Sequence, residues 1–112
     1  PPYALAGWYG FYAKGDMNYH LMQKEAVARA LLPYDNVRIY DFQARRDWIT
    51  NLDHYIDATH YGPWINEAIV DAVSRDEYRI TDPAQVRANN EVIAALVAQI
   101  AQAGTWPDEF AL

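Results

Sequence analysis

The chain has 112 residues, of which 52% are hydrophobic and 21% charged, a balance typical of a globular domain rather than a disordered segment. Fifteen acidic residues against nine basic ones give a formal net charge of −6, which argues against partners such as nucleic acid or an anionic membrane surface. No stretch approaches the roughly 20 apolar residues that cross a bilayer, and the absence of cysteine excludes disulfides, thiolate zinc sites and thiol catalysis.

The first third of the chain predicts one well-defined helix. Residues 3–12 are apolar and aromatic but interrupted by glycine, and they predict an ordered loop or a short helix. Asp16 has the residue type of an N-cap, and Pro33 ends the helix that follows it near Leu32. One face of this helix should be buried, with an apolar stripe at Met17, Leu21, Lys24, Ala28 and Leu31, widened by Met22 and Val27.

A strand and a long connection follow. Residues 37–42 alternate between polar and apolar or aromatic side chains, the pattern of a β-strand. Residues 43–57 have no sustained period and predict an irregular loop. Loops of this length inside domains are usually functional or disordered, and the apolar content of this one argues against disorder.

Two helices complete the chain. Gly62-Pro63 opens a helix that extends to about Ser74, since proline suits the first helical position. Asp82-Pro83 opens another that extends to Ala103, with Gly104 as the residue that ends it. Because one strand cannot form a sheet, its neighbours must come from a second copy or from a larger α/β domain. The start at Pro1-Pro2 favours the larger domain, so residues 1–112 are interpreted as a single partial domain.

The densest group of ionisable side chains lies in residues 51–61. Asp57 and His60 are three residues apart in an expected turn, a spacing that lets the carboxylate accept a hydrogen bond from the imidazole Nδ1–H. That bond would leave Nε2 free to act as a general base. Two other interpretations stay open. Most Asp-x-x-His pairs are solvated or capping pairs, and a mixed oxygen and nitrogen metal site could be formed from Asp53, His54, Asp57 and His60.

Nothing else in the sequence completes a metal shell, so we expect no metal and no cofactor. Aromatic side chains flank the Asp57–His60 pair and could form a stacking wall for a sugar or an acyl group; core packing is the alternative role for them. The candidates for substrate binding are Trp48, Tyr61 and Trp64.

Residues 40–42, residues 51–61 and the helix from Pro63 resemble the C-terminal part of an SGNH/GDSL-type hydrolase, in which a late Asp-x-x-His block precedes the last helices. The pattern is similar to that of bacterial SGNH-like proteins linked to acyl-group chemistry of the cell envelope, and the likeness extends from Pro1 to about Gln102. It implies the C-terminal part of a three-layer α/β/α, flavodoxin-like domain with a parallel sheet, mostly helical within this chain. It also implies ester chemistry by Ser, His and Asp, with His60 as general base and Asp57 as its orienting carboxylate.

The chain departs from that family in lacking the Gly-Asp-Ser block that carries the nucleophile and the upstream glycine and asparagine of the oxyanion hole. Ser74 is the only serine, and it falls near the end of a helix beyond His60. We therefore expect the His/Asp half of a serine esterase or acyltransferase, inactive alone, whose partner is the missing N-terminal half and whose substrate is a small-molecule or carbohydrate O-acyl ester. The family setting leans towards an extracytoplasmic, cell-envelope location.

Two other functions remain open. One is a non-catalytic helical module that uses its aromatic surface for interaction with a partner or a ligand. The other is a degenerate family member that binds ligand without chemistry. The amount of exposed apolar surface distinguishes the first of these from part of a hydrolase domain. Part of a domain should expose a large apolar patch where the missing sheet belongs, whereas a complete module should bury its apolar side chains.

Overall fold

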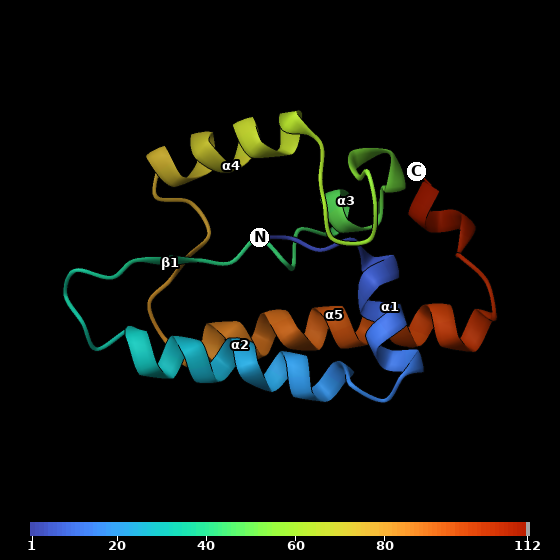
Figure 1. The fold of residues 1–112 in the computed structure, drawn as a ribbon, viewed down its shortest axis with the longest axis horizontal. Helices are drawn as coiled ribbons and strands as arrows, with labels where there is room; N and C mark the ends of the chain where they lie inside the picture. Colours follow the sequence, from blue (N-terminus) through green and yellow to red (C-terminus); the bar gives the residue numbers. More distant parts are fainter. Residues whose placement is uncertain (112) are drawn as a thin grey trace.

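In the computed structural model, residues 1–111 of the chain are described, and helices dominate them (Figure 1). The elements in chain order are α1 (Leu5–Ala13), α2 (Met17–Leu31), β1 (Ile39–Tyr40), α3 (Arg46–Ile49), the 3-10 helix η1 (Leu52–His54), α4 (Pro63–Ser74), β2 (Arg79–Ile80), α5 (Pro83–Ala103) and the 3-10 helix η2 (Asp108–Ala111). None of the described helices is long and apolar enough to cross a membrane.

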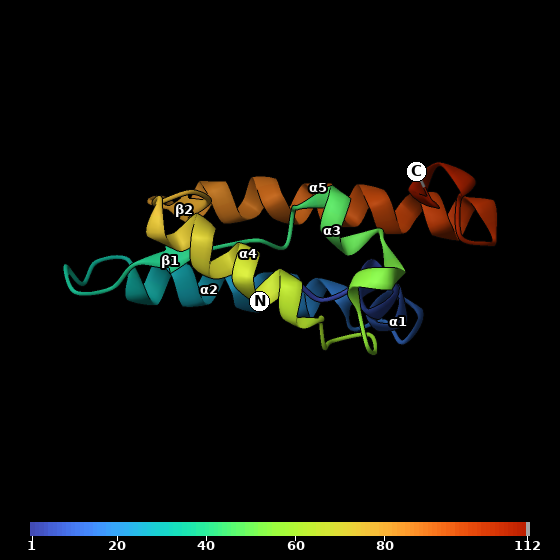
Figure 2. The same ribbon diagram turned by 90° about the horizontal axis from the view of Figure 1, so that it is seen from above.

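The body of the molecule is the packing of α1 and α2 against the long helix α5. Figures 1 and 2 show α2 and α5 running side by side in opposite directions, with α1 against the other half of α5. Helix α5 begins with a capping box, in which the Asp82 side chain and the Gln85 side chain satisfy each other's backbone N–H groups, and it ends at Gly104 with φ of 69°. The core beneath these helices is formed by Leu5, Trp8, Leu21, Ile49, Ile93, Leu96, Val97, Ile100 and Phe110.

Helix α2 confirms the predicted bounds but buries a narrower face than expected. Leu21 and Ala28 are buried, whereas the side chains that were to widen the stripe, Met22 and Val27, are 68% and 53% exposed, and Leu31 is 40% exposed. The reason is geometric, because α5 covers only one side of α2 and the other side faces solvent.

The expected three-layer α/β/α arrangement with a parallel sheet is wrong. The described residues contain one two-stranded sheet, in which β1 pairs with β2 antiparallel in the register Ile39↔Ile80 and Tyr40↔Arg79. The chain reverses after α4 through Asp76 and Tyr78, both at positive φ (58° and 63°), and this turn brings β2 alongside β1 in the opposite direction. Strand β1 is also shorter than the predicted strand over residues 37–42.

The segment predicted as an irregular loop over residues 43–57 contains α3 and η1. Trp48 and Ile49 of α3 are buried, and Asn51 caps η1 by accepting a hydrogen bond from the Asp53 backbone N–H. Single helical turns of this kind are too short to show the repeating period from which helices are predicted. Helix α1 resolves the two options for residues 3–12 in favour of a helix, and α4 and α5 confirm the two predicted C-terminal helices.

Candidate functional site

The Asp57–His60 pair lies in a small hairpin that precedes α4. Tyr55 and Tyr61 form an antiparallel bridge, and the Ile56 N–H donates to the His60 carbonyl at 2.7 Å. Residues 57–59, between Ile56 and His60, form the turn. The turn reverses the chain and brings His60 opposite Asp57. The Gly62 N–H then donates to the His54 carbonyl at 2.8 Å, which joins the hairpin to η1.

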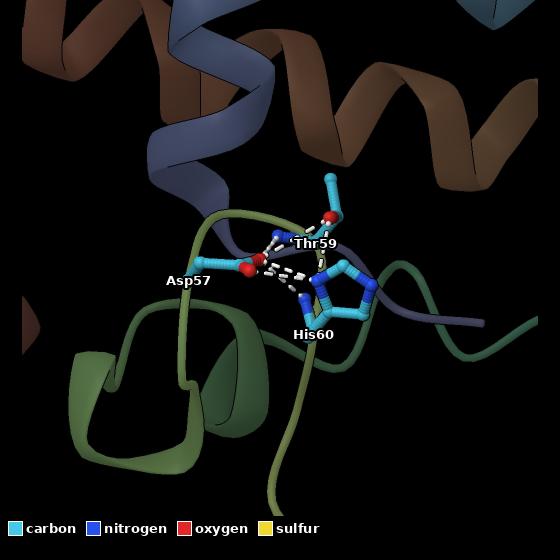
Figure 3. Close-up of polar contacts among 3 residues, drawn as sticks. All are labelled: Asp57, Thr59 and His60. Atoms are coloured by element: carbon cyan, nitrogen blue, oxygen red, sulfur yellow. Dashed lines mark hydrogen bonds and ion pairs between the residues drawn. The ribbon is translucent and has the colours of Figure 1, made fainter.

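Within the turn, the Asp57 carboxylate contacts the His60 ring as the three-residue spacing predicts. His60 Nδ1 lies 2.7 Å from Asp57 Oδ2 and 2.8 Å from Oδ1 (Figure 3). The Thr59 and His60 backbone N–H groups each donate to Asp57 Oδ1 at 2.9 Å. A carboxylate at this distance assigns the proton of a neutral ring to Nδ1, which leaves the Nε2 lone pair available to a substrate or a nucleophile.

The local hydrogen bonds also determine the charge state of Asp57. The Thr59 backbone N–H, followed by the His60 side chain, stabilises the carboxylate and lowers the Asp57 pKa to about 2. The Asp57 and His60 side chains are 56% and 72% exposed, so the pair is open to solvent rather than enclosed. Asp57 is therefore a permanent anion beside Nδ1 across the neutral pH range.

His60 borders a hollow of about 380 Å³ on the surface. Its lining combines aromatic rings with polar groups and consists of Pro1, Tyr3, Thr59, His60, Tyr61 and Asn66. The residues before α1 form one wall, and hydrogen bonds hold them there. The Gln43 carboxamide bonds both the N–H and the carbonyl of Tyr3 at 2.8 Å, and the Tyr55 hydroxyl donates to the Pro2 carbonyl at 3.0 Å.

A second anchor joins the hairpin to α1. The Ala4 N–H donates to the Ala58 carbonyl at 3.1 Å, and a Cβ atom built on Gly7 would lie only 2.8 Å from that same oxygen. Helix α1 can approach the turn this closely because position 7 has no side chain. The turn that carries the imidazole is thus seated on the first turn of α1.

The three aromatic candidates for substrate binding lie in different environments. Tyr61 lines the hollow with His60. Trp64 is 51% exposed, and its ring lies against Gly62, where an added Cβ atom would come within 2.5 Å of it. Trp48 does not line this hollow: it is 7% exposed, stacked on Phe42 at 5.7 Å between ring centroids, with the Arg45 guanidinium 4.1 Å from the ring centroid.

Ser74 lies too far along α4 to serve the imidazole. It is the last residue of a 12-residue helix whose first turn adjoins His60, and the rise of an α-helix places it about 16 Å from that turn. Its hydroxyl donates to the Asp71 carbonyl at 2.6 Å. Nor do residues 1–111 gather three acidic or histidine side chains in the way that the metal interpretation required, and the His54 ring instead contacts the Trp48 carbonyl at 3.3 Å.

Several residues of the site were missed in the sequence. For Thr59 the usable signal lay in Asp57, because an aspartate side chain often accepts a hydrogen bond from the backbone N–H two residues on, which places residue 59 in the turn. Gly7, Tyr3 and Asn66 carried none, since each reaches the turn or the hollow through the fold and not through nearby residues.

Comparison of the chain with family models, curated proteins and solved structures gives no match. The basis for a functional proposal is therefore the geometry around Asp57 and His60.

Proposed function

We propose that Asp57 and His60 are the orienting carboxylate and the general base of a serine-dependent ester hydrolase or acyltransferase. The observation that supports this most strongly is the 2.7 Å contact between Asp57 Oδ2 and His60 Nδ1, with the other side of the ring exposed. This is the arrangement that a triad requires of its histidine and its acidic member.

In this proposal, a serine hydroxyl attacks the carbonyl carbon of an O-acyl ester while His60 Nε2 takes the hydroxyl proton. The Asp57 carboxylate stabilises the imidazolium that forms. The imidazolium then gives its proton to the departing alkoxide, which leaves an acyl-serine and a free alcohol. Water or an acceptor alcohol, deprotonated in turn by Nε2, then attacks the acyl-serine and releases the acyl group as an acid or as a new ester, while the imidazolium returns its proton to the departing serine oxygen.

The serine and the oxyanion donors come from polypeptide other than residues 1–112. Ser74 is about one α4 length from the imidazole, and its hydroxyl is engaged with Asp71. A histidine and an aspartate without a nucleophile and an oxyanion hole lack the largest contributions to catalysis. The 112-residue chain alone is therefore expected to be inactive towards unactivated esters.

The hollow beside His60 supports a small-molecule or carbohydrate ester as the substrate. Tyr3 and Tyr61 contribute aromatic side chains to its lining, and the Asn66 carboxamide offers both a donor and an acceptor. Rings for stacking combined with a few polar groups are the usual lining of a site that binds a polar, ring-shaped ligand.

The test is ester hydrolysis by the native protein or complex that contains these residues, assayed with p-nitrophenyl acetate and an O-acetylated saccharide. Removing a triad member lowers kcat by roughly 10⁴-fold in serine hydrolases, so His60→Ala and Asp57→Asn should each abolish measurable turnover. His20→Gln, on α2, is the matched histidine control and should retain activity. A fluorophosphonate reagent should label a serine other than Ser74.

Turnover that survives His60→Ala would overturn the proposal, as would a fluorophosphonate adduct on Ser74. Unactivated-ester hydrolysis by the isolated 112-residue chain would contradict the external origin of the nucleophile.

A non-catalytic interaction module is the second candidate, and the exposed apolar side chains of α4 favour it. Trp64, Val70 and Val73 on this helix are 51%, 68% and 38% exposed. Under that alternative, the native protein should show no ester turnover that depends on His60 and no fluorophosphonate-labelled serine, and partner binding should instead be lost when these three side chains are changed.

A further inference from the structure

A threonine hydroxyl accompanies the Asp57–His60 pair on its Nδ1 side. Thr59 Oγ1 donates to Asp57 Oδ1 at 3.2 Å and lies 3.3 Å from His60 Nδ1. Figure 3 shows the hydroxyl, the carboxylate and the ring nitrogen arranged as a triangle at the tip of the turn. The Thr59 hydroxyl thus contacts both the Asp57 carboxylate and the His60 ring, and unlike those two groups it does not ionise.

We propose that Thr59 is a positioning residue, whose hydroxyl holds the Asp57 carboxylate in the plane that directs it at His60 Nδ1. This inference rests on the proposed function, because it assigns a role within the same dyad. Under this inference, the side chains of Asp57, Thr59 and His60 act together, so the contact between Asp57 and His60 depends on Thr59 as well as on their spacing.

The backbone bonds to Asp57 do not by themselves hold the carboxylate in that plane. Both backbone N–H groups bind Oδ1, so they hold one oxygen and leave Oδ2 able to swing towards solvent. Solvent is a strong competitor here, since the Asp57 side chain is 56% exposed. The Thr59 hydroxyl differs from these N–H groups because it approaches Oδ1 from the side of His60 Nδ1, which it contacts at 3.3 Å. A bond from that direction opposes rotation of the carboxylate about the Cβ–Cγ bond and so keeps Oδ2 at the ring.

The position of the hydroxyl excludes a nucleophilic role for Thr59. It lies on the Nδ1 side of the ring, whereas the nitrogen that would accept a proton from a nucleophile is Nε2. A general base activates a hydroxyl that is hydrogen-bonded to its free nitrogen. Thr59 therefore acts through Asp57 and not on the substrate.

The experiment measures the tautomer of the His60 ring in the 112-residue chain by long-range ¹⁵N–¹H NMR, at about two pH units above the ordinary imidazole value. In the unmodified chain, the Nδ1–H tautomer should dominate. Thr59→Val keeps the shape and removes the hydroxyl, and it should raise the Nε2–H population about fivefold, the effect of one net hydrogen bond. Thr59→Ser restores a hydroxyl and should reverse the change.

Two reference variants make the result decisive. Thr81→Val removes another threonine hydroxyl, one that contacts Gln85 far from the turn, and should leave the His60 tautomer unchanged. Asp57→Asn reports on the dyad itself and should shift the tautomer more than Thr59→Val does. In the native enzyme, Thr59→Val should lower kcat about fivefold with KM unchanged.

A Thr59→Val spectrum identical to that of the unmodified chain, alongside a shift in Asp57→Asn, would overturn the role of Thr59 and leave the dyad standing. A shift that Thr59→Ser does not reverse would assign the effect to methyl packing and would also overturn it. If Asp57→Asn causes no shift either, both this inference and the dyad of the proposed function fail.

Discussion

The helical body and the hairpin over residues 55–61 are held together by different forces. In the body, Leu5 and Ile93 are fully enclosed, and α1, α2 and α5 cover them with apolar side chains. In the hairpin, Ile56 is 78% exposed and the His60 side chain is 72% exposed. Hydrogen bonds from the Asp57 carboxylate and from the first residues of the chain define the hairpin's shape instead.

This difference separates what makes the molecule stable from what arranges its chemistry. Apolar burial contributes in proportion to area and does not depend on exact direction, whereas hydrogen bonds contribute little net energy but specify direction. Changes in the body should therefore lower the free energy of unfolding, and changes in the turn should alter the geometry of His60 at little cost in stability.

The largest predicted effect compares one isoleucine from each region. Ile93→Ala removes a fully enclosed side chain from α5 and should lower the free energy of unfolding by about 4 kcal/mol, since the cavity cannot collapse between three helices. Ile56→Ala should change it by less than about 0.5 kcal/mol. Urea unfolding monitored by circular dichroism measures both, and equal effects would erase the distinction between body and hairpin.

A partly buried ion pair tests whether the body depends on apolar contacts alone. Lys24 Nζ lies 3.1 Å from Asp41 Oδ2 without a well-aligned hydrogen bond, and burial lowers the Lys24 pKa. Asp41→Ala should cost about 3 kcal/mol because it leaves this ammonium unpaired. The exposed Asp35→Ala is the matched control and should cost almost nothing.

The sign of the pH dependence checks the cause of that loss. Because the Lys24 pKa is lower in the folded chain than in the unfolded chain, the unfolded chain binds more protons in the interval below 10.5. The free energy of unfolding of Asp41→Ala should therefore rise with pH in that interval. A pH-independent loss would point to packing around Asp41 instead.

Two glycines of α1 test the anchor between the regions. Gly7→Ala places a Cβ atom against the Ala58 carbonyl and should cost about 2 kcal/mol while displacing the turn. A Cβ atom on Gly10 meets nothing within 4 Å, so Gly10→Ala should stabilise the helix by roughly 0.5–1 kcal/mol. Thermal unfolding gives the energies, and the His60 NMR signals report the displacement. Gains in both variants would show that α1 does not seat the turn.

The smallest predicted effect is the loss of the Asp57 contribution to the free energy of unfolding at low pH. The Asp57 pKa is about 2 in the folded chain against an ordinary value of 3.8, so its carboxylate stabilises the fold fully above pH 3.8. That contribution is lost as the pH falls from 3.8 through about 2. Over this interval, the unmodified chain should lose stability relative to Asp57→Asn. Parallel acid-unfolding curves for the two chains would contradict the lowered pKa.

The features that could be predicted from the sequence are those encoded by neighbouring residues. Proline followed by a period of three to four residues indicated α4 and α5 with their bounds, and Gly104 ended α5 as expected. The Asp57–His60 contact was predictable for the same reason, because its hydrogen bonds close within a turn.

The remaining features depend on contacts between distant residues. Strand β2 has two residues and no alternating pattern, and its antiparallel pairing follows from positive φ angles at Asp76 and Tyr78 that neither residue type announces. The hollow beside His60 requires Tyr3 and Asn66, more than 60 positions apart, to line the same site. The environment of Trp48 likewise depends on the packing of Phe42 and Arg45 against its ring.

The Gln43 side chain has a mechanical consequence. Its carboxamide, 3% exposed, binds the N–H and the carbonyl of Tyr3 much as a neighbouring strand would. The residue after Tyr3 is Ala4, whose backbone N–H donates a hydrogen bond to the Ala58 carbonyl in the turn. Tension applied to the polypeptide at Tyr3 would therefore be shared between the Gln43 carboxamide and the Ala4–Ala58 hydrogen bond, and the second of these lies two residues from the imidazole.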